Sequence, residues 1–333
     1  MIENICITGV SGYLGRRLVK GLLAMPDIRR LIGIDVVPPA EKLPGMDVFR
    51  MDIRDSALKS ILTGNNIDTV FHLAFVVKPI HDLKKMHDVD MNGTRNVLES
   101  CRKAGVRRII AISSTLAYGA HPDNPPELNE DHPLRGNPSF PYGYQKARVD
   151  EMIQDFSQRW PEMTITTLRP CTVFGPRVDN YVSRMLFRPV TVRVSGNNPP
   201  VQFVHEDDFV NACLLALKSQ HSGAFNIAAD GTLTAAEIAS IIGTRAIPLP
   251  AWLLYPLVEI LWQCRAPGIE VNKGYLDYAR YSFVSSNQKA KSLLGFEPRY
   301  TSREVLDDTL RARFSNRLQG GNREIKTDEK TTA

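Results

Sequence analysis

A glycine-rich stretch near the start of the chain constrains the fold more than any other feature. Residues 8–15 read Thr-Gly-Val-Ser-Gly-Tyr-Leu-Gly and follow the apolar run Ile5-Cys6-Ile7. Leucines then recur at helical spacing up to residue 24, so the pattern predicts a buried strand, a tight glycine turn and a helix. Glycines let a backbone approach a ligand closely, and the free N–H groups of a helix start attract phosphate. The stretch therefore predicts the pyrophosphate cradle of a dinucleotide site.

An acidic residue ends the next predicted strand. Leu31-Ile32-Gly33-Ile34 leads into Asp35, about 20 residues after Gly15. An acid at this place binds the adenosine ribose hydroxyls and repels a 2′-phosphate, and no Arg or Lys follows before Lys42. The sequence therefore favours NAD over NADP as the cofactor.

Predicted strands and helices alternate through the first two-thirds of the chain, the pattern of an α/β fold with a doubly wound parallel sheet. The alternation fails from Val173 onward, although residues 201–205 and 224–228 are each still predicted as a strand. We expect an NAD-binding domain over 1–172 that a returning segment at about 201–230 joins. We expect a smaller, mainly helical substrate lobe over 173–200 and 231–318, and a disordered tail over 319–333.

Composition excludes several classes of function. The chain has 333 residues, 43% of them hydrophobic, which is enough for a large core. Its net charge of +5 is spread without a basic run interleaved with aromatics, so nucleic-acid binding has little support. The five cysteines form no C-x-x-C pair, and the first strand leaves no room for a signal peptide, so we expect reduced thiols, no metal site and a cytoplasmic location.

One strongly apolar stretch, residues 248–263, is too short to span a membrane and contains Pro256 and Glu259. Three interpretations remain open. The stretch is a buried helix of the second lobe, a lid over an apolar substrate, or a surface that touches a membrane or a partner.

Tyr142 and Lys146 stand four residues apart at a predicted helix start, so both project from one face. A free phenol has a pKa near 10, and an ammonium one turn away, together with a positive nicotinamide ring, would lower it. Ser114 follows the strand predicted at 108–112, at the sheet edge where such folds bind ligands. These three residues predict a site that oxidises hydroxyls or reduces carbonyls.

The chain resembles an extended short-chain dehydrogenase/reductase of the NAD-dependent epimerase/dehydratase family, in particular its bacterial UDP-glucose 4-epimerase-like subgroup. The resemblance covers almost the whole chain. Its motifs are Thr-Gly-x-x-Gly-x-x-Gly at 8–15, Asp52-Ile53, His72-Leu73-Ala74, Asn92-Gly93-Thr94, Ser113-Ser114, Tyr142-x-x-x-Lys146, Arg169-Pro170, Phe203-Val204-His205-x-Asp207-Asp208 and Ser286-Asn287.

The resemblance implies a Rossmann fold and a role for each matching residue. The catalytic residues would be Ser114, Tyr142 and Lys146. The residues implied around the cofactor, besides Tyr142 and Lys146, are Gly9, Gly12, Tyr13, Leu14 and Gly15 at the pyrophosphate, Asp35 at the ribose, Asp52 and Ile53 at the adenine, Leu73 and Ala74 along its length, Asn92 in support, and Pro170 and Val173 beside the nicotinamide.

Two departures from the family pattern affect the predicted reaction. Dehydratases of the family carry Asp-Glu where this chain has Thr115-Leu116, so 4,6-dehydration is not expected. Thr172 replaces an Asn that contacts the substrate diphosphate in many members. The residues expected to contact the substrate are Thr115, Thr172, Arg177, Arg184 and Arg280, and the three arginines are the ones expected to bind its diphosphate.

We therefore expect a cytoplasmic NAD-dependent epimerase of a nucleotide sugar, homodimeric through the helices near 84–104 and 142–158. The alternative is a net dehydrogenase or ketoreductase, using NAD or NADP, that acts on an apolar alcohol or ketone, which would accumulate reduced cofactor. A third hypothesis is a non-catalytic NAD-binding sensor, a class that usually lacks the Tyr or the Lys.

Overall fold

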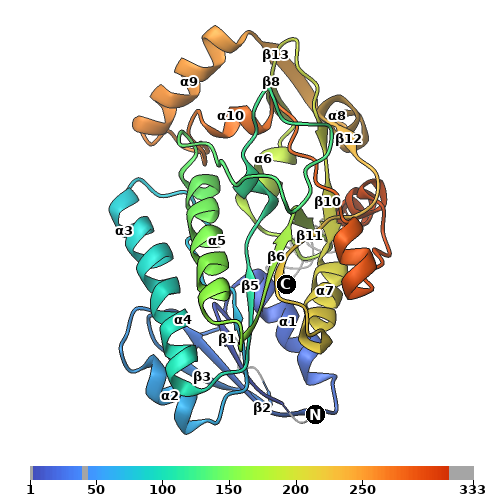
Figure 1. Cartoon of the computed structure of the whole chain (residues 1–333). Helices are drawn as coiled ribbons and strands as arrows, with labels where there is room; N and C mark the ends of the chain where they lie inside the picture. The colour runs from blue at the N-terminus through green and yellow to red at the C-terminus, as the bar shows by residue number, and fades with distance from the viewer. Residues whose placement is uncertain (1–2, 40–43, 315–333) are drawn as a thin grey trace, which may run out of the picture.

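The computed structural model describes residues 3–39 and 44–314. A seven-stranded sheet, parallel throughout, lies at its centre in the order β11-β6-β5-β4-β1-β2-β3 (Figure 1). The strands are β1 (Glu3–Thr8), β2 (Ile28–Asp35), β3 (Asp47–Arg50), β4 (Thr69–His72), β5 (Arg108–Ile112), β6 (Thr164–Pro170) and β11 (Gly223–Ile227). The predicted doubly wound α/β fold is confirmed.

The strand order reverses between β1 and β4, because β1 pairs with both β2 and β4. The chain lays β2 and β3 on one side of β1 and the later strands on the other. Loops at the carboxyl ends of β1 and β4 therefore diverge to opposite sides, and open parallel sheets bind ligands in the crevice that this leaves.

Helices cover both faces of the sheet. One face packs on α1 (Tyr13–Leu23) and α7 (Glu206–Lys218), and the other on α2 (Leu58–Gly64), α4 (Gly93–Ala104) and α5 (Pro141–Arg159). Ile5 and Ile7 of β1 point to the first face while Cys6 between them points to the second, as alternation along a strand requires. Because both faces are buried, the strands are apolar runs.

The structure divides the helix expected over 84–104 into three consecutive helical segments. These are α3 (Leu83–His87), a π-helical turn η1 (Asp88–Asn92), and α4, which ends at Gly105 with φ +75°. The apolar side chains of α4 and α5, such as Val97 and Ile153, are buried against the sheet. These apolar faces therefore belong to the intramolecular core, and the homodimer that the family resemblance implies stays a prediction.

After β6 the elements are shorter. The strands are β7 (Thr172–Phe174), β8 (Val190–Val194), β9 (Pro200–Val201), β10 (Phe203–His205), β12 (Leu233–Thr234) and β13 (Arg245–Leu249). The helices are α6 (Tyr181–Leu186), α8 (Ala235–Ile242), α9 (Ala251–Gln263), α10 (Tyr275–Tyr278), the π-helical η3 (Ala290–Leu294) and helical residues 302–314. A short 3₁₀ turn, η2 (Thr115–Tyr118), follows β5.

One predicted strand in this region differs from the structure. The single strand expected at 201–205 is two, because β9 pairs with β12 and β10 pairs with β7. The domain boundaries remain a prediction, and the predicted tail at 319–333 lies outside the described residues.

The apolar stretch 248–263 forms the end of β13 and α9, and the interpretation as a buried helix is wrong. Leu254 is the one residue of α9 that is fully buried, while Trp252, Leu253, Leu257 and Ile260 are exposed. Among residues 3–39 and 44–314, no helix has the length and apolar character needed to cross a membrane.

Candidate active site

A cleft of about 1090 Å³ lies at the carboxyl ends of the central strands. Most residues predicted for the site line it together, although they come from distant parts of the chain. The predicted residues that line it are Gly9, Gly12, Tyr13, Leu14, Gly15, Asp35, Asp52, Ile53, Leu73, Ala74, Ser114, Tyr142, Lys146, Pro170, Thr172, Val173 and Arg184.

The glycine turn between β1 and α1 has no room for a Cβ atom at Gly9 or Gly15. Gly9 has φ +75°, and a Cβ there would stand 2.6 Å from the backbone nitrogen of Ala74. A Cβ on Gly15 would stand 2.5 Å from the carbonyl oxygen of Gly9. At Gly12, the N-cap of α1, a Cβ would stand 3.3 Å from the carbonyl oxygen of Gly9, which is a tight contact but less severe than at Gly9 and Gly15.

The start of α1 suits an anion. No side chain caps its first turn and no acidic residue lies within it, so its N–H groups remain available. At the end of β2, the Asp35 carboxylate accepts hydrogen bonds from the backbone N–H of Ser11, at 3.0 Å, and of Val37, at 3.2 Å. The turn, the helix start and the acid together fit the pyrophosphate and ribose of a dinucleotide.

Ser114 is placed by the end of β5. Its Oγ accepts a hydrogen bond from the N–H of Leu116 at 3.2 Å and donates to the carbonyl oxygen of Pro170 at 3.4 Å. Both contacts hold the hydroxyl at the wall of the cleft.

Tyr142 and Lys146 come from the first two turns of α5, which begins with Pro141, a residue well suited to a helix start. The Tyr142 ring packs edge-on against Phe75, with the ring centroids 5.7 Å apart. The Lys146 Nζ donates to the carbonyl oxygen of Ile112 at 2.8 Å and lies 3.6 Å from the centroid of the same Phe75 ring. Phe75 therefore fixes the two side chains relative to each other.

The protein groups do not lower the pKa of Tyr142. Burial raises it well above the usual range, and the nearby Asp90 raises it further. Burial also lowers the pKa of Lys146 to about 8, and Asp90 and Asp150 oppose that change. The expected effect of an adjacent ammonium is therefore outweighed by desolvation and by an acid that sequence analysis did not single out.

That acid, Asp90, lies in η1 with no exposed surface. One carboxylate oxygen accepts a hydrogen bond from the N–H of Val76 at 2.9 Å, and the other has no partner among the described residues. Burial raises its pKa to about 6. A signal existed in the sequence, because Asp90 falls on the buried stripe with Met86 and Val97, where an acid is out of place.

Four predicted site residues do not line the cleft. Asn92 is exposed and bonds to Asp88 and Arg95. Thr115 is buried beside the site, and its hydroxyl has no partner among the described residues. The other two are Arg177 and Arg280.

The three arginines predicted to bind the substrate diphosphate interact mainly with other side chains of the protein. Arg184 lines the cleft but pairs with Asp179 and with Glu270, each at 2.8 Å. Arg177 lies 3.8 Å from the buried Glu206, and the Arg280 guanidinium lies 5.0 Å from the Tyr281 ring centroid. None of the three side chains is thus an uncommitted cation that faces the cleft.

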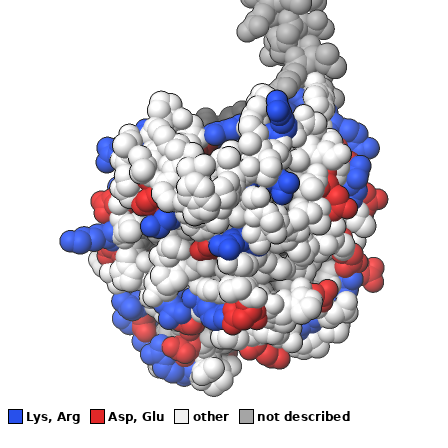
Figure 2. All heavy atoms as spheres, turned by 90° about the horizontal axis from the view of Figure 1, so that it is seen from above, with Lys and Arg blue, Asp and Glu red and all other residues white. Residues whose placement is uncertain are grey.

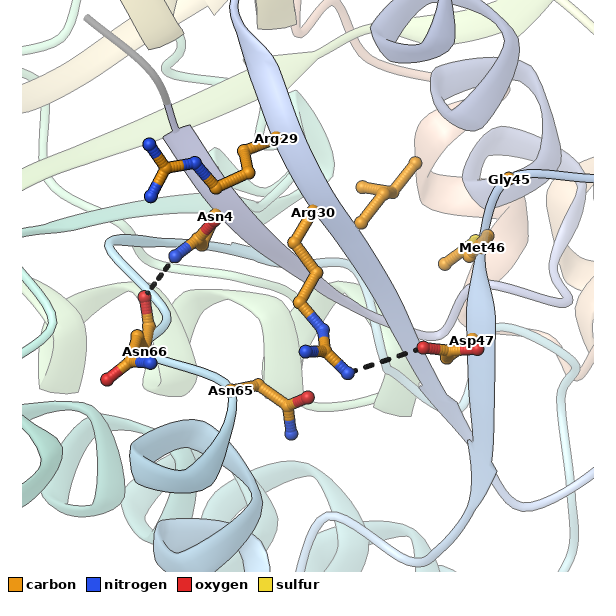
Figure 3. A pocket seen from close by; sticks show the side chains of 9 residues that line it. Asn4, Arg29, Arg30, Gly45, Met46, Asp47, Asn65 and Asn66 are labelled. Carbon is orange, nitrogen blue, oxygen red and sulfur yellow. Dashed lines mark hydrogen bonds and ion pairs between the residues drawn. The ribbon is translucent and has the colours of Figure 1, made fainter.

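A second hollow, of about 440 Å³, lies at the amino ends of β1, β2 and β3 (Figure 3). Arg30 pairs there with Asp47 at 3.4 Å, and the Asn4 amide donates to the carbonyl oxygen of Asn66 at 2.9 Å. It lies at the sheet edge opposite the carboxyl ends and shares no residue with the cleft. Over the described residues, no group of three His, Cys, Asp or Glu side chains could hold a metal ion.

Solved structures share this fold. The UDP-glucose 4-epimerase of Thermotoga maritima, solved with UDP-glucose, is 22% identical, with a TM-score of 0.71 over 95% of this chain and 99% of that one. The dTDP-glucose 4,6-dehydratase DesIV of Streptomyces venezuelae, solved with NAD, is 22% identical, with a TM-score of 0.73 over 95% and 98%.

Curated relatives are similar in sequence. An uncharacterised protein of Mycobacterium tuberculosis is 27% identical over 93% of this chain and 84% of its own length. The N-acetyl-alpha-D-glucosaminyl-diphospho-ditrans,octacis-undecaprenol 4-epimerase of Escherichia coli O157:H7 is 32% identical over 56% of this chain and 54% of its own length.

A family model matches the greater part of the chain. It describes the NAD dependent epimerase/dehydratase family and matches residues 5–228, from β1 through the end of β11. The match confirms the predicted resemblance, the enzymatic character of the chain and NAD as the cofactor. By sequence, by fold and by the build of its cleft, the chain belongs to the NAD-dependent epimerase/dehydratase family.

Proposed function

We propose that the protein is an epimerase of the UDP-hexose 4-epimerase type, which inverts a hydroxyl-bearing carbon of a nucleotide sugar through a transient ketone. The observation that carries the proposal is the convergence of Ser114, Tyr142 and Lys146 on one cleft with the glycine turn and Asp35. The epimerases named among the relatives support it.

The side chains divide the proton chemistry between them. The Tyr142 oxygen takes the proton of the sugar hydroxyl as that carbon is oxidised and returns it when the carbon is reduced on its other face. The Ser114 hydroxyl hydrogen-bonds to the same sugar oxygen and keeps it in line with Tyr142. NAD, when bound, supplies the hydride acceptor for the first half of this cycle and the donor for the second.

Lys146 acts on Tyr142 as a positive charge. Its ammonium stabilises the phenolate, and the positive nicotinamide ring adds to that effect, against the burial and the Asp90 charge that raise the pKa. The side chains after Ser114 argue against dehydration, because Thr115 and Leu116 offer no acid to protonate a leaving hydroxyl.

A second function has an observation in its favour. Arg184 is paired on the cleft wall, and Val76, Val77, Ile80 and Leu116 make much of that wall apolar. These features suit a net dehydrogenase that acts on an apolar alcohol or ketone with NAD or NADP.

The test is to incubate the purified protein with UDP-hexoses and to follow both the sugar product and reduced cofactor. The epimerase proposal predicts an inverted sugar without accumulation of NADH. Steady NADH formation with an apolar alcohol, and no inverted sugar, would favour the second function. If no substrate turned over and Tyr142→Phe left the biological function intact, the non-catalytic sensor hypothesis would replace both.

The variant Tyr142→Phe should lower kcat by about 10²–10⁴-fold, the usual share of a general acid–base group, while NAD binding is retained. Tyr144→Phe is the matched control. Tyr144 lies two residues further along α5, and its ring packs under the Arg148 guanidinium, 5.3 Å from the centroid. Equal losses in the two variants would contradict the role given to Tyr142.

A further inference from the structure

Helix α9 carries its apolar side chains on the outside. Trp252 is 77% exposed and Ile260 is 60% exposed, and Leu253 and Leu257 are exposed between them. Trp252 and Leu253 are adjacent, and Leu257 and Ile260 follow at spacings of four and three residues, which places all four on one side of the helix. A surface helix of a globular protein normally turns such a stripe toward the core.

The opposite face of α9 holds the helix in place. Leu254 is 1% exposed and packs with Val194 of β8 and Leu276 of α10. The Tyr255 hydroxyl donates to Asp277 of α10 at 2.8 Å, and the Glu259 carboxylate accepts a hydrogen bond from the backbone N–H of Lys273 at 3.4 Å. These contacts hold α9 in one orientation. The exposure of Trp252, Leu257 and Ile260 therefore follows from how the helix packs.

The apolar surface continues onto the neighbouring strands. Val190, Val192 and Val194 alternate along β8 and so share a side, on which Val194 is covered by α9. Val190 and Val192 are half exposed on that side, and Ile247 of β13 pairs with Val192 in register. We call the following exposed side chains the apolar end surface: Val190, Val192, Ile247, Trp252, Leu253, Leu257 and Ile260. Figure 1 shows α9, β8 and β13 together at one end of the molecule.

Basic residues flank the apolar end surface. Arg245 begins β13, Arg265 follows α9, and Lys273 lies before α10; all three are exposed, and none forms an ion pair with another described residue. Among the nearby acids, Glu270 pairs with Arg184, Asp82 caps α3, and Glu259 of α9 accepts hydrogen bonds from the Gln263 amide and the Lys273 backbone N–H. Figure 2, which looks onto this end, shows a broad uncharged area bordered by Lys and Arg side chains, with Asp and Glu side chains among them.

The carboxyl-terminal end of α9, next to the apolar end surface, contacts a segment at the mouth of the cleft. The Trp262 ring, near the end of α9, stacks on the His81 ring with the centroids 4.1 Å apart. Lys78 and Ile80, just before His81, line the cleft itself. Whatever covers α9 therefore also lies beside the substrate entrance.

We propose that the apolar end surface docks on the surface of an anionic phospholipid bilayer, with α9 lying in the interface and the cleft mouth beside the headgroups. Tryptophan and aliphatic residues on one face, with Lys and Arg beside them, suit the boundary between acyl chains and anionic headgroups. The charge favours this occupant, because Arg245, Arg265 and Lys273, exposed beside the apolar end surface, would meet anionic headgroups there.

The test is co-sedimentation of the full chain with vesicles of phosphatidylcholine and phosphatidylglycerol, and with vesicles of phosphatidylcholine alone. We expect binding to the anionic vesicles and at least about tenfold weaker binding to the neutral ones. The variant with Trp252→Ser, Leu257→Ser and Ile260→Ser should lose at least about tenfold in anionic vesicle affinity. Because these side chains are exposed, the variant should retain NAD binding, which shows that it is folded.

The control variant carries Leu23→Ser and Leu293→Ser, two leucines of similar exposure outside the apolar end surface. It should bind vesicles like the unmodified protein. Absence of vesicle binding, or equal binding by the triple variant, would overturn the proposal. A dimer that the triple variant dissociates, without vesicle binding, would show instead that a second copy covers α9. None of these outcomes depends on the sugar substrate, so the proposed function is tested separately.

Discussion

Asp90 shows how one buried carboxylate connects the site to the stability of the fold. Burial raises its pKa to about 6 in the folded protein, while an aspartate in an unfolded chain has a pKa of about 3.9. Between these values the folded state keeps a proton that the unfolded state has released. The stabilising contribution of Asp90 is therefore fully present below about pH 4 and is lost as the pH rises through about 6.

The prediction concerns Asp90→Asn. The free energy of unfolding of the unmodified protein should lose about 2 kcal/mol more than that of the variant between pH 4 and pH 6. Urea unfolding at several pH values measures the difference. Asp155→Asn, at an exposed position of α5, is the control and should follow the unmodified protein. Parallel curves for the Asp90 variant and the unmodified protein would contradict the raised pKa.

Gly15 tests the glycine turn. In Gly15→Ala the Cβ would stand 2.5 Å from the carbonyl oxygen of Gly9 and 2.7 Å from that of Val10, so the backbone must move. We expect a loss of about 1–3 kcal/mol in unfolding free energy and at least about tenfold weaker NAD binding by calorimetry, because the moved groups belong to the proposed pyrophosphate cradle.

Gly64→Ala is the matched control for that variant. Gly64 ends α2, is exposed, and a Cβ there would meet nothing within 4 Å. Its NAD affinity should be unchanged and its stability equal or slightly higher. If Gly15→Ala behaved like Gly64→Ala, the turn would not be the cradle.

At the scale of elements, α5 depends on a buried ion pair. Arg169 of β6 makes two hydrogen bonds of 2.9 Å to Asp150 of α5, and both residues are almost fully buried. Arg169 also donates to the Tyr118 hydroxyl at 2.8 Å. The pair therefore fixes the helix that carries Tyr142 and Lys146 against the sheet.

Removing Arg169 leaves a buried carboxylate without its partner. Arg169→Met should lower the unfolding free energy by about 3–5 kcal/mol, measured in urea. Arg303→Met, which breaks an exposed pair with Asp307, should cost less than about 1 kcal/mol. A double variant with Arg169→Met and Asp150→Leu should recover part of the loss, and failure of Arg169→Met to exceed Arg303→Met would contradict this role.

The elements that sequence predicted well are those with a local signal. The strand, glycine turn and helix at residues 3–23 and the start of α5 at Pro141 follow from spacing within each segment. The π-helical turn η1 and the division between β9 and β10 do not, because both depend on partners elsewhere. β9 pairs with β12, and the Asp90 carboxylate binds the N–H of Val76.

At the scale of the whole molecule, the cofactor half of the cleft was predictable and the substrate half was not. The cofactor residues carry family motifs in short runs. Arg184, by contrast, is a plausible diphosphate contact in the sequence, but its pairing with Glu270, 86 residues away, is visible only in the fold. The same holds for α9, where Leu254 is fully buried, Tyr255 and Val258 pack beside it, and Trp252, Leu257 and Ile260 are exposed.

The most direct test of the central claim, an NAD-dependent site at this cleft, is the cofactor content of the purified full chain. The protein is denatured, and the released nucleotide is identified and quantified. We predict NAD, retained at close to one molecule per chain, and strongly reduced retention in Gly15→Ala. An empty protein that also fails to bind added NAD in calorimetry would contradict the account.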